Sequence, residues 1–354
     1  MRIVEVIPTL NVGGAEKFVV NLSAHLSELG HACHLVTLFD SATMQTQITG
    51  LPSSVVRSSL GKSHGFDFRC LLRLMKFISK EKPDVVHAHI GAITYLLFAA
   101  VFCRKTKYFA TIHSEAKREA GSLLHRLVRK FLFKLNFVRP VTISDESRTS
   151  FVEFYGMQPS MIYNGAPDFK DTSVAVENSK KIFVHVASCQ PVKNQELLLK
   201  SFAQLAEKYK DVELHWYGSN TLCPELFASL SSYFSDQIMY KGIVSEVRSV
   251  LSNATAMCLS SKMEGMPMTI IEAMSVGCIS AATPVGGCKN MIVDGVNGFL
   301  SADLTVESYS EMLEKIITLP ESKFKEVRLN SRLSYEAEYS IGICANLYLD
   351  LFQN

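Results

Sequence analysis

The chain has 354 residues, of which 47% are hydrophobic, so it can bury two ordinary cores and two domains are expected. Its net charge is only +2, and no nucleic-acid partner is expected. Its nine cysteines include no Cys-x-x-Cys pair, which excludes the usual zinc and redox spacings and favours a reduced, cytoplasmic protein. The charge is uneven, because residues 1–165 hold 20 Lys/Arg against 12 Asp/Glu and residues 166–354 hold 16 against 22, so the first half is expected to meet something anionic.

The N-terminal residues have the pattern of a parallel α/β sheet. An apolar strand is predicted over residues 2–7, and no signal peptide is expected before it. A glycine-containing turn over residues 8–14, a helix from Ala15 to Gly30 and a strand over residues 32–39 follow. Strand, turn, helix and strand in this order start a βαβ unit. The turn lacks the Gly-x-Gly-x-x-Gly fingerprint, which disfavours a Rossmann dehydrogenase.

Two histidines accompany the next predicted strand. A helix over residues 67–80 precedes a strand over residues 84–88, where His87 and His89 stand two positions apart. Such a pair could ligate a metal, but no third ligand is expected nearby, so a structural role is favoured. The apolar run at 90–103 is too short to span a bilayer and predicts a buried helix.

A third histidine, His113, follows the predicted strand at 107–112. Ligands of open α/β sheets bind at the carboxyl ends of strands. His113 is therefore a candidate site residue, and the alternative is a loop histidine with satisfied hydrogen bonds.

Residues 117–136 predict a basic amphipathic helix. Its basic residues are Lys117, Arg118, Arg126, Arg129, Lys130 and Lys134, and its apolar ones are Leu123, Leu124, Leu127, Val128, Phe131, Leu132 and Leu135. One interpretation is a helix that docks electrostatically on an anionic membrane surface. The other is a domain helix with solvated charges. Its apolar residues are expected to serve mostly the core, so deep insertion is not expected.

The rest of the chain completes one α/β domain and forms a second. A strand at 137–143, a helix capped by Ser144 and a strand at 160–163 close the first domain, and residues 167–180 have the polar composition of a linker. Further strands are predicted at 181–187, 212–217 and 237–240, and further helices at 195–209, 305–318, 322–336 and 340–352, while residues 254–259 lead into the next stretch.

The most informative stretch runs from residue 260 to residue 300. Glu264 lies in a loop, Pro267 suits a helix start, and residues 268–275 predict a helix that carries Glu272. The first amides of a helix have no internal partner and favour an anionic ligand. Two acids beside such a terminus and a glycine-rich turn at 284–287 indicate a phosphate-bearing ligand with hydroxyls. A capped core helix with incidental Glu residues is the alternative.

This stretch resembles the retaining glycosyltransferases of family 4, through Glu264-x7-Glu272 and the flanking runs EGMPMTIIEAMSVG and DGVNGFL. The resemblance implies an α/β fold of the GT-B type, in which two Rossmann-like parallel-sheet domains face across a cleft. The expected parts are an acceptor-side domain (1–166), a linker (167–180), a nucleotide-sugar-binding domain (181–336) and a C-terminal helix that packs back on the first domain (337–354).

The resemblance also implies roles for individual residues. Glu264 would lie near the transferred sugar, Glu272 would bind the donor ribose, and His113 would lie near the donor sugar and the acceptor. Lys193 would neutralise the leaving diphosphate, which makes Glu264, His113 and Lys193 the expected catalytic residues. The expected donor-binding residues are Gly13, Gly14, Ser188, Lys193, Asn194, Ile243, Gly265, Met266, Met268, Thr269 and Glu272.

One position departs from the family pattern. An Arg is expected five residues before Lys193, where this chain has Ser188. Arg and Lys together would neutralise a diphosphate. Either Lys193 acts with another cation, such as Lys262 or Lys289, or the enzyme is weaker than its relatives.

The function implied is transfer, with retention, of a sugar from a UDP- or GDP-sugar to a hydroxyl of a glycan or lipid-linked acceptor in cell-surface polysaccharide synthesis. The sequence has no Asp-x-Asp motif, so no divalent metal and no cofactor are expected. The protein would be cytoplasmic, with peripheral binding to the inner membrane face through residues 117–136. A GT-B sugar-nucleotide epimerase and a degenerate, non-catalytic nucleotide-sugar binder, which Ser188 would favour, remain the alternatives.

Overall fold

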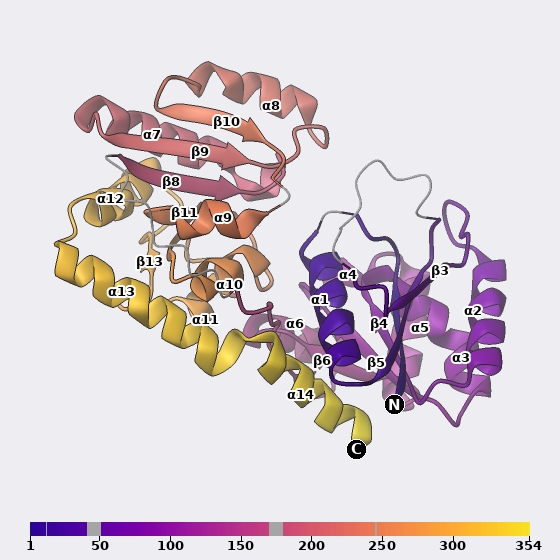
Figure 1. The fold of residues 1–354 in the computed structure, drawn as a ribbon. Helices are drawn as coiled ribbons and strands as arrows, with labels where there is room; N and C mark the ends of the chain where they lie inside the picture. The colour runs from indigo at the N-terminus through magenta and orange to yellow at the C-terminus, as the bar shows by residue number, and fades with distance from the viewer. Residues whose placement is uncertain (12, 41–50, 170–179, 245) are drawn as a thin grey trace. The chain divides into compact units, whose positions relative to one another are not determined.

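The chain forms two compact units in the computed structural model, which describes residues 1–11, 13–40, 51–169, 180–244 and 246–354 (Figure 1). The first unit comprises Met1–Pro167 and Ile341–Asn354, and the second comprises Asp168–Ser340. Ten residues of the predicted linker (170–179) and position 12 of the first predicted turn lie outside the described residues.

The first unit is built on a seven-stranded parallel sheet with the order β3-β2-β1-β4-β5-β6-β7. The strands are β1 (Arg2–Ile7), β2 (Ala32–Thr37), β3 (Val56–Ser59), β4 (Val85–His89), β5 (Lys107–Ile112), β6 (Arg139–Thr142) and β7 (Ser160–Met161). In β1, β4 and β5 almost every residue is buried, as in a sheet covered on both faces. Strand β3 was not predicted, because it is an edge strand with mostly exposed residues.

Helices cover this sheet, since the strand order reverses at β1 (Figure 1). They are α1 (Gly14–Glu28), α2 (Phe68–Glu81), the 3₁₀ helix η2 (Ile90–Leu96), α3 (Leu97–Phe102), α4 (Ala116–Ala120), α5 (Leu123–Lys134), α6 (Asp145–Tyr155) and α14 (Ile341–Gln353). The predicted Ser144 cap is confirmed, since its side chain accepts a hydrogen bond from the Ser147 amide.

Two predicted helices are divided in the structure. The run at 90–103 is a 3₁₀ segment followed by α3, and it begins at Ile90, whose φ of +52° is unusual for a β-branched residue. The run at 117–136 is broken at Gly121, whose φ is +67°. A regular apolar pattern therefore continues across positions where the backbone leaves the α conformation.

The C-terminal helix α14 belongs to the first unit and packs against α1. The Tyr348 hydroxyl lies 2.8 Å from Thr111 Oγ1 in β5. The Lys107 ammonium donates to the carbonyls of Phe352 and Gln353, at 3.1 and 2.5 Å, and so caps the helix end.

The second unit has a six-stranded parallel sheet with the order β10-β9-β8-β11-β12-β13. The strands are β8 (Lys181–Val186), β9 (Val212–Tyr217), β10 (Ile238–Gly242), β11 (Ala256–Leu259), β12 (Ile279–Ala282) and β13 (Phe299–Leu300). Taken in chain order, six strands of each unit follow the doubly wound pattern 3-2-1-4-5-6. In this pattern ligands bind beyond the carboxyl ends of the strands at the reversal, which is between β8 and β11 here.

The helices of the second unit agree with the longer sequence patterns. They are α7 (Gln195–Lys208), α8 (Pro224–Leu230), α9 (Val247–Ser252), α10 (Met268–Ser275), α11 (Cys288–Met291), α12 (Val306–Ile317) and α13 (Glu321–Ser334), with 3₁₀ turns at Pro191–Lys193 and Ser231–Tyr233 and a π-helical turn at Tyr335–Tyr339. Helix α10 has the predicted bounds. In the described parts of the chain, no helix combines the length and the apolar character needed to cross a membrane.

Candidate functional site

Two loops meet beyond the carboxyl ends of β8 and β11, where the strand order of the second unit reverses. The loop after β8 carries Lys193, and the loop after β11 carries Glu264. The amide of Lys262 donates to the Val192 carbonyl at 2.8 Å, and the Ser260 hydroxyl donates to the Lys193 carbonyl at 3.0 Å. These two bonds hold the loops side by side and bring together two residues that are 71 positions apart.

The centre of this site is an ion pair. Lys193 Nζ lies 2.7 Å from Glu264 Oε1, and the Ser261 hydroxyl donates to the same oxygen at 2.5 Å. The Glu264 side chain is 9% exposed and that of Lys193 is 27% exposed, so the pair is screened from water more than a surface pair but remains accessible. An incoming anion can therefore compete with Glu264 for the ammonium group.

Helix α10 begins directly after this loop. Pro267 occupies the N-cap, so the amides of Met268 and Thr269 are in the first turn, where backbone donors have no intrahelical acceptor. Glu272 lies on the same helix and is 2% exposed. The predicted acids thus flank a helix start that carries partial positive charge.

The glycine-rich turn at 284–287 packs directly on the loop that holds Glu264. The Gly287 amide donates to the Gly265 carbonyl at 2.9 Å. A Cβ atom at Gly287 would lie 2.3 Å from that carbonyl oxygen, which is too close for any side chain. Gly287 is therefore required for the loop geometry, and the next residue along the loop, Met266, is buried with 6% exposed area.

The loop at Ser188 is held by hydrogen bonds of two buried polar residues that were not predicted as site residues. Gln195 Nε2 donates to the Ser188 carbonyl at 3.0 Å and lies 3.3 Å from His185 Nε2. His185 Nδ1 lies 2.8 Å from the Cys258 carbonyl, and burial lowers the pKa of His185 to about 4. The neutral ring donates from Nδ1 and accepts at Nε2. The sequence feature that could have indicated this support is a histidine inside the apolar run of β8.

The remaining predicted donor residues follow β8 and β10 of the same sheet. Asn194 has a φ of +51° and joins the 3₁₀ turn to α7, a conformation that asparagine tolerates well. Ile243 follows β10 and is 62% exposed. Lys262 and Lys289, which were considered as replacements for the missing Arg, are both exposed.

In the first unit, the predicted site residues lie at the carboxyl ends of β1 and β5. Gly13 is the N-cap of α1, Gly14 is its first residue, and the Glu16 carboxylate folds over Gly13. Burial raises the pKa of Glu16. His113 follows β5, and its amide donates to Glu119 Oε2 at 2.7 Å.

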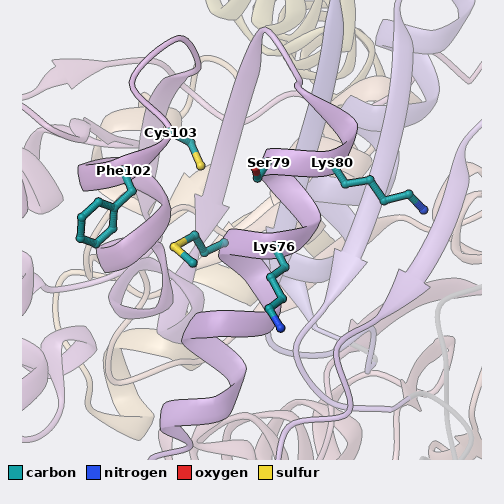
Figure 2. Close-up of a pocket in the computed structure, with 6 residues that line it drawn as sticks. Lys76, Ser79, Lys80, Phe102 and Cys103 are labelled. Atoms are coloured by element: carbon teal, nitrogen blue, oxygen red, sulfur yellow. The ribbon is translucent and has the colours of Figure 1, made fainter.

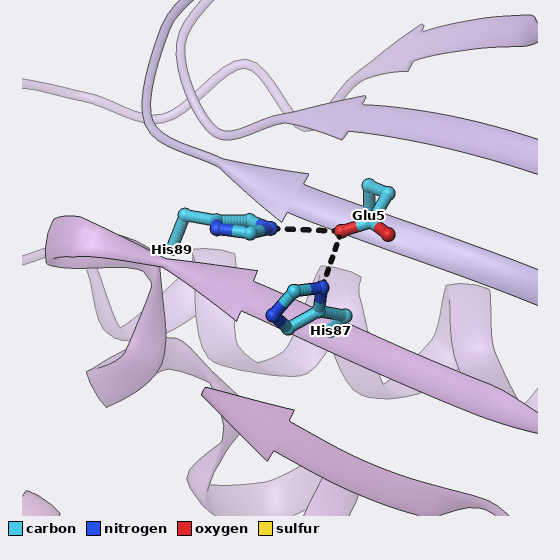
Figure 3. Close-up of side chains that lie close together, drawn as sticks. All are labelled: Glu5, His87 and His89. Atoms are coloured by element: carbon cyan, nitrogen blue, oxygen red, sulfur yellow. Dashed lines mark hydrogen bonds and ion pairs between the residues drawn. The ribbon is translucent and has the colours of Figure 1, made fainter. Parts of the chain in front are cut away.

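Glu5, His87 and His89 form a buried polar cluster (Figure 3), and His89 Nδ1 lies 3.0 Å from His113 Nε2. Glu5 Oε2 is 2.8 Å from His89 Nε2 and 3.0 Å from His87 Nδ1, and all three side chains are fully buried. The expectation that His87 and His89 have no third candidate ligand nearby is wrong, because Glu5 of β1 approaches them from the neighbouring strand. The distance of 2.8 Å is that of a hydrogen bond, which agrees with the structural role predicted for this pair.

Helix α5 differs from the sequence interpretation in two ways. Arg129 was counted among the solvated charges, but it is 2% exposed, donates to the Ile90 carbonyl at 2.8 Å and lies 3.6 Å from Glu119. Several apolar residues that were expected to serve the core are exposed instead. They are Leu123, Leu124, Leu127, Phe131 and Leu135. The apolar stripe of α5 is therefore partly a surface feature.

A hollow of about 570 Å³ lies on α2 and α3 (Figure 2). Its lining consists of Met75, Lys76, Ser79, Lys80, Phe102 and Cys103. None of these residues belongs to either group of site residues, so this hollow is not part of the candidate site.

Comparisons with known proteins agree with this arrangement. Residues 12–168 match the family described as Glycosyltransferase Family 4, and residues 168–337 match Glycosyl transferases group 1. The chain is 23% identical over 308 residues to N-acetyl-alpha-D-glucosaminyl L-malate synthase of Bacillus anthracis, covering 82% of this chain and 81% of that protein. It is 23% identical over 274 residues to the UDP-Gal:alpha-D-GlcNAc-diphosphoundecaprenol alpha-1,3-galactosyltransferase of Escherichia coli, covering 71% and 70%.

Solved structures share the fold over the whole chain. The crystal structure of Anabaena Alr3699/HepE in complex with UDP-glucose superposes with a TM-score of 0.83 at 16% identity and covers 100% of this chain and 99% of that one. At this level of identity the likeness establishes the fold.

Proposed function

Because the chain belongs to the glycosyltransferases of family 4 and has their GT-B fold, we propose that it moves a sugar, with retention of anomeric configuration, from a UDP- or GDP-sugar to a hydroxyl of a glycan or lipid-linked acceptor. The observation that carries the proposal is the Lys193–Glu264 pair, 2.7 Å apart beside the start of α10. The names of relatives that act on diphosphoundecaprenol-linked sugars support a role in surface polysaccharide synthesis.

The proposed donor site uses charge and backbone donors together. The diphosphate takes the place of Glu264 as the partner of the Lys193 ammonium and receives hydrogen bonds from the Met268 and Thr269 amides. Glu264, released from Lys193, turns to a hydroxyl of the transferred sugar and stabilises the positive charge that develops there. Glu272 accepts hydrogen bonds from the ribose hydroxyls.

Transfer then follows a same-face route. The bond from the anomeric carbon to the diphosphate breaks, the acceptor oxygen approaches from the same face, and the leaving diphosphate takes the acceptor proton. This route needs no protein nucleophile, and Lys193 with the start of α10 stabilises the departing charge. We propose no metal or cofactor for it, because the sequence has no Asp-x-Asp motif and Lys193 supplies the cationic charge.

Ser188 supports one competing function. It stands where the family has an Arg, so one fixed cation is missing and a degenerate nucleotide-sugar binder would have this feature. The hydrogen bond from Gln195 to the Ser188 carbonyl keeps the loop ordered without that cation. We therefore favour an active enzyme in which Lys193 carries the charge.

We also propose that the protein binds an anionic membrane surface through α5, on the inner face of the membrane. The exposed leucines and Phe131 of that helix alternate with the exposed ammonium groups of Lys130 and Lys134. Such a face inserts shallowly while its cations meet lipid phosphates. A lipid-linked acceptor would be reached at the same surface.

The test of the proposed function is a ligand screen followed by product analysis. Thermal unfolding is measured with UDP, GDP, ADP and their sugar conjugates in the presence of EDTA. A ligand at 100 times its dissociation constant adds about 2.7 kcal/mol to the free energy of unfolding. A shift with one nucleotide family, followed by sugar transfer to an acceptor, supports the proposal. Binding without transfer identifies a degenerate binder, and an epimerised donor without acceptor identifies an epimerase.

A further inference from the structure

We propose that Glu5 and His89 are positioning residues that fix His113 as the neutral tautomer with its proton on Nε2, so that Nδ1 of His113 is offered to the ligand as a hydrogen-bond acceptor. The tautomer is inferred from the buried hydrogen bonds together with the charge states of Glu5 and His89. Its use in catalysis rests on the function proposed above, in which His113 contacts the sugar or the acceptor.

The three side chains form a continuous chain of hydrogen bonds across neighbouring strands. Glu5 Oε2 lies 2.8 Å from His89 Nε2, and His89 Nδ1 lies 3.0 Å from His113 Nε2. The residues come from β1, β4 and the end of β5, which pair in parallel register. Both ring nitrogens of His89 are therefore engaged, one on each side.

Counting protons along this chain leaves one arrangement. Burial opposes ionisation of Glu5, but the charge and hydrogen bonds of His87 and His89 outweigh it and lower the pKa of Glu5 to about 2. An ionised carboxylate only accepts, so His89 must donate from Nε2. Burial lowers the pKa of His89 to about 4, so the ring is neutral and its Nδ1 accepts. The donor to that nitrogen is His113 Nε2.

His113 is itself held neutral. Burial, followed by the neighbouring His89 and His87, lowers its pKa well below the usual value. A neutral ring has one proton, which is on Nε2, so its Nδ1 carries a lone pair. Among the described residues Nδ1 has no hydrogen-bond partner, and it is the nitrogen left for a ligand.

The surroundings support this arrangement from every packed element. From α1, the Phe18 ring packs edge-on against His113 and His89, with centroids 5.7 and 6.2 Å away. The other titratable or charged groups around the chain are His87 and Tyr348, which both contact the Thr111 hydroxyl, the thiols of Cys33 and Cys344, and the Glu119–Arg129 pair behind the His113 amide. Burial is the first cause that raises the pKa values of both thiols and of Tyr348, so these groups are neutral.

The tautomer determines what His113 can bind. A lone pair on Nδ1 accepts a hydrogen bond from a hydroxyl of a sugar or an acceptor, whereas it repels a phosphate oxygen. His113 therefore selects hydroxyl-bearing groups and does not add to diphosphate binding. A protonated imidazolium at the same place would instead attract a phosphate oxygen and could not accept a hydrogen bond from a hydroxyl.

The direct experiment is long-range proton–nitrogen NMR of the ¹⁵N-histidine-labelled protein without ligand, between pH 6 and pH 8. We expect His113 to show a protonated Nε2 and an unprotonated Nδ1 that do not change over this range. A proton on Nδ1, or titration near the ordinary histidine pKa of about 6.5, would overturn the proposal.

Three variants separate positioning from a merely structural role. His89→Leu removes the acceptor, so His113 is expected to populate both tautomers and to titrate. His89→Asn can place an amide oxygen near the former Nδ1 position and should rescue the wild-type signature. Thr111→Val, the matched control, removes the bonds to His87 and Tyr348 on the far side of the cluster and should lower stability while leaving the His113 signals unchanged.

Kinetics provide the second readout. With an ordinary pKa of about 6.5, roughly three-quarters of His113 would be protonated at pH 6. The ratio of His89→Leu to wild-type kcat/KM is therefore expected to fall about fourfold between pH 8 and pH 6, with a constant ratio for Thr111→Val. The expected NMR pattern in a protein without transfer activity would overturn the proposed function but leave the tautomer standing. Transfer activity in a protein whose His113 carries its proton on Nδ1 would overturn the tautomer but leave the proposed function standing.

Discussion

Replacing Lys193 by Ala removes the one ammonium group that the proposed mechanism places against the leaving diphosphate. In the free protein Lys193 also neutralises Glu264, since the two groups are 2.7 Å apart. The substitution therefore acts twice. It deletes the attraction for the diphosphate, and it leaves the 9%-exposed carboxylate of Glu264 with the Ser261 hydroxyl and no cation, close to where the phosphates would bind.

The size of the effect follows from these two contributions. Loss of one preorganised group that stabilises a developing charge costs about 2–4 kcal/mol. Each 1.36 kcal/mol is a factor of ten in rate, so kcat/KM should fall about 30- to 1,000-fold. Because no Arg stands at position 188 to share the charge, the upper part of this range is expected.

The assay is steady-state transfer in EDTA with the donor identified by the ligand screen. Lys262→Ala is the control, since Lys262 is an exposed lysine on the neighbouring loop after β11, and it should retain most activity. The double variant Lys193→Ala/Glu264→Gln removes the uncompensated carboxylate. It should recover donor affinity relative to Lys193→Ala without recovering turnover. Wild-type kcat/KM in Lys193→Ala would refute the assignment of Lys193 to the diphosphate.

Three further outcomes are expected. Glu272→Ala should raise the KM for the donor by about tenfold to a hundredfold, with a smaller change in kcat, because it removes charged acceptors for hydroxyls; an effect confined to kcat would contradict the ribose assignment. Lys130→Glu/Lys134→Glu should reduce flotation with anionic vesicles, and wild-type flotation should weaken with salt; salt-insensitive flotation of both proteins would exclude electrostatic docking. The free energy of unfolding, measured with urea, should decrease by about 3 kcal/mol as the pH falls from 6.5 to 4, because His89 is then protonated in the unfolded chain only. It should decrease by a similar amount below pH 4.5 as Glu5 is protonated, since folding lowers both pKa values. An unchanged free energy of unfolding from pH 7 to pH 4 would contradict the buried neutral ring.

The sequence was most informative where burial and local backbone preference favour the same secondary structure. The strands Arg2–Ile7, Lys107–Ile112 and Val212–Tyr217 and the helix Met268–Ser275 have their predicted bounds. Each is an apolar or alternating run between strong turn residues, so burial and local backbone preference agree. The loop of Glu264 was found for the same reason, because a proline start and a glycine stop surround the helix that follows.

The sequence was least informative where a contact depends on distant residues. Glu5 is one acidic residue in an apolar strand, and nothing local connects it with His89, 84 positions later. Arg129 looked like one more basic residue on an amphipathic helix, yet it lies on the inner side and binds the carbonyl of Ile90, whose backbone conformation no propensity predicts. In both cases parallel strand pairing and helix rotation decide the partners, and these are tertiary properties.

The division of the first unit between the two ends of the chain has a consequence for synthesis. Thr111 of β5 and Tyr348 of α14, which are hydrogen-bonded, are 237 residues apart, and the whole second unit is inserted between them. While the ribosome makes residues 168–340, the surface that α14 covers stays open to water and to other nascent chains. The second unit can fold first as an independent insert, whereas the first unit closes last. Contacts of such long sequence separation slow folding and expose apolar surface to aggregation. Packing of α14, whose last carbonyls accept hydrogen bonds from Lys107, is thus the step that covers this surface of the first unit.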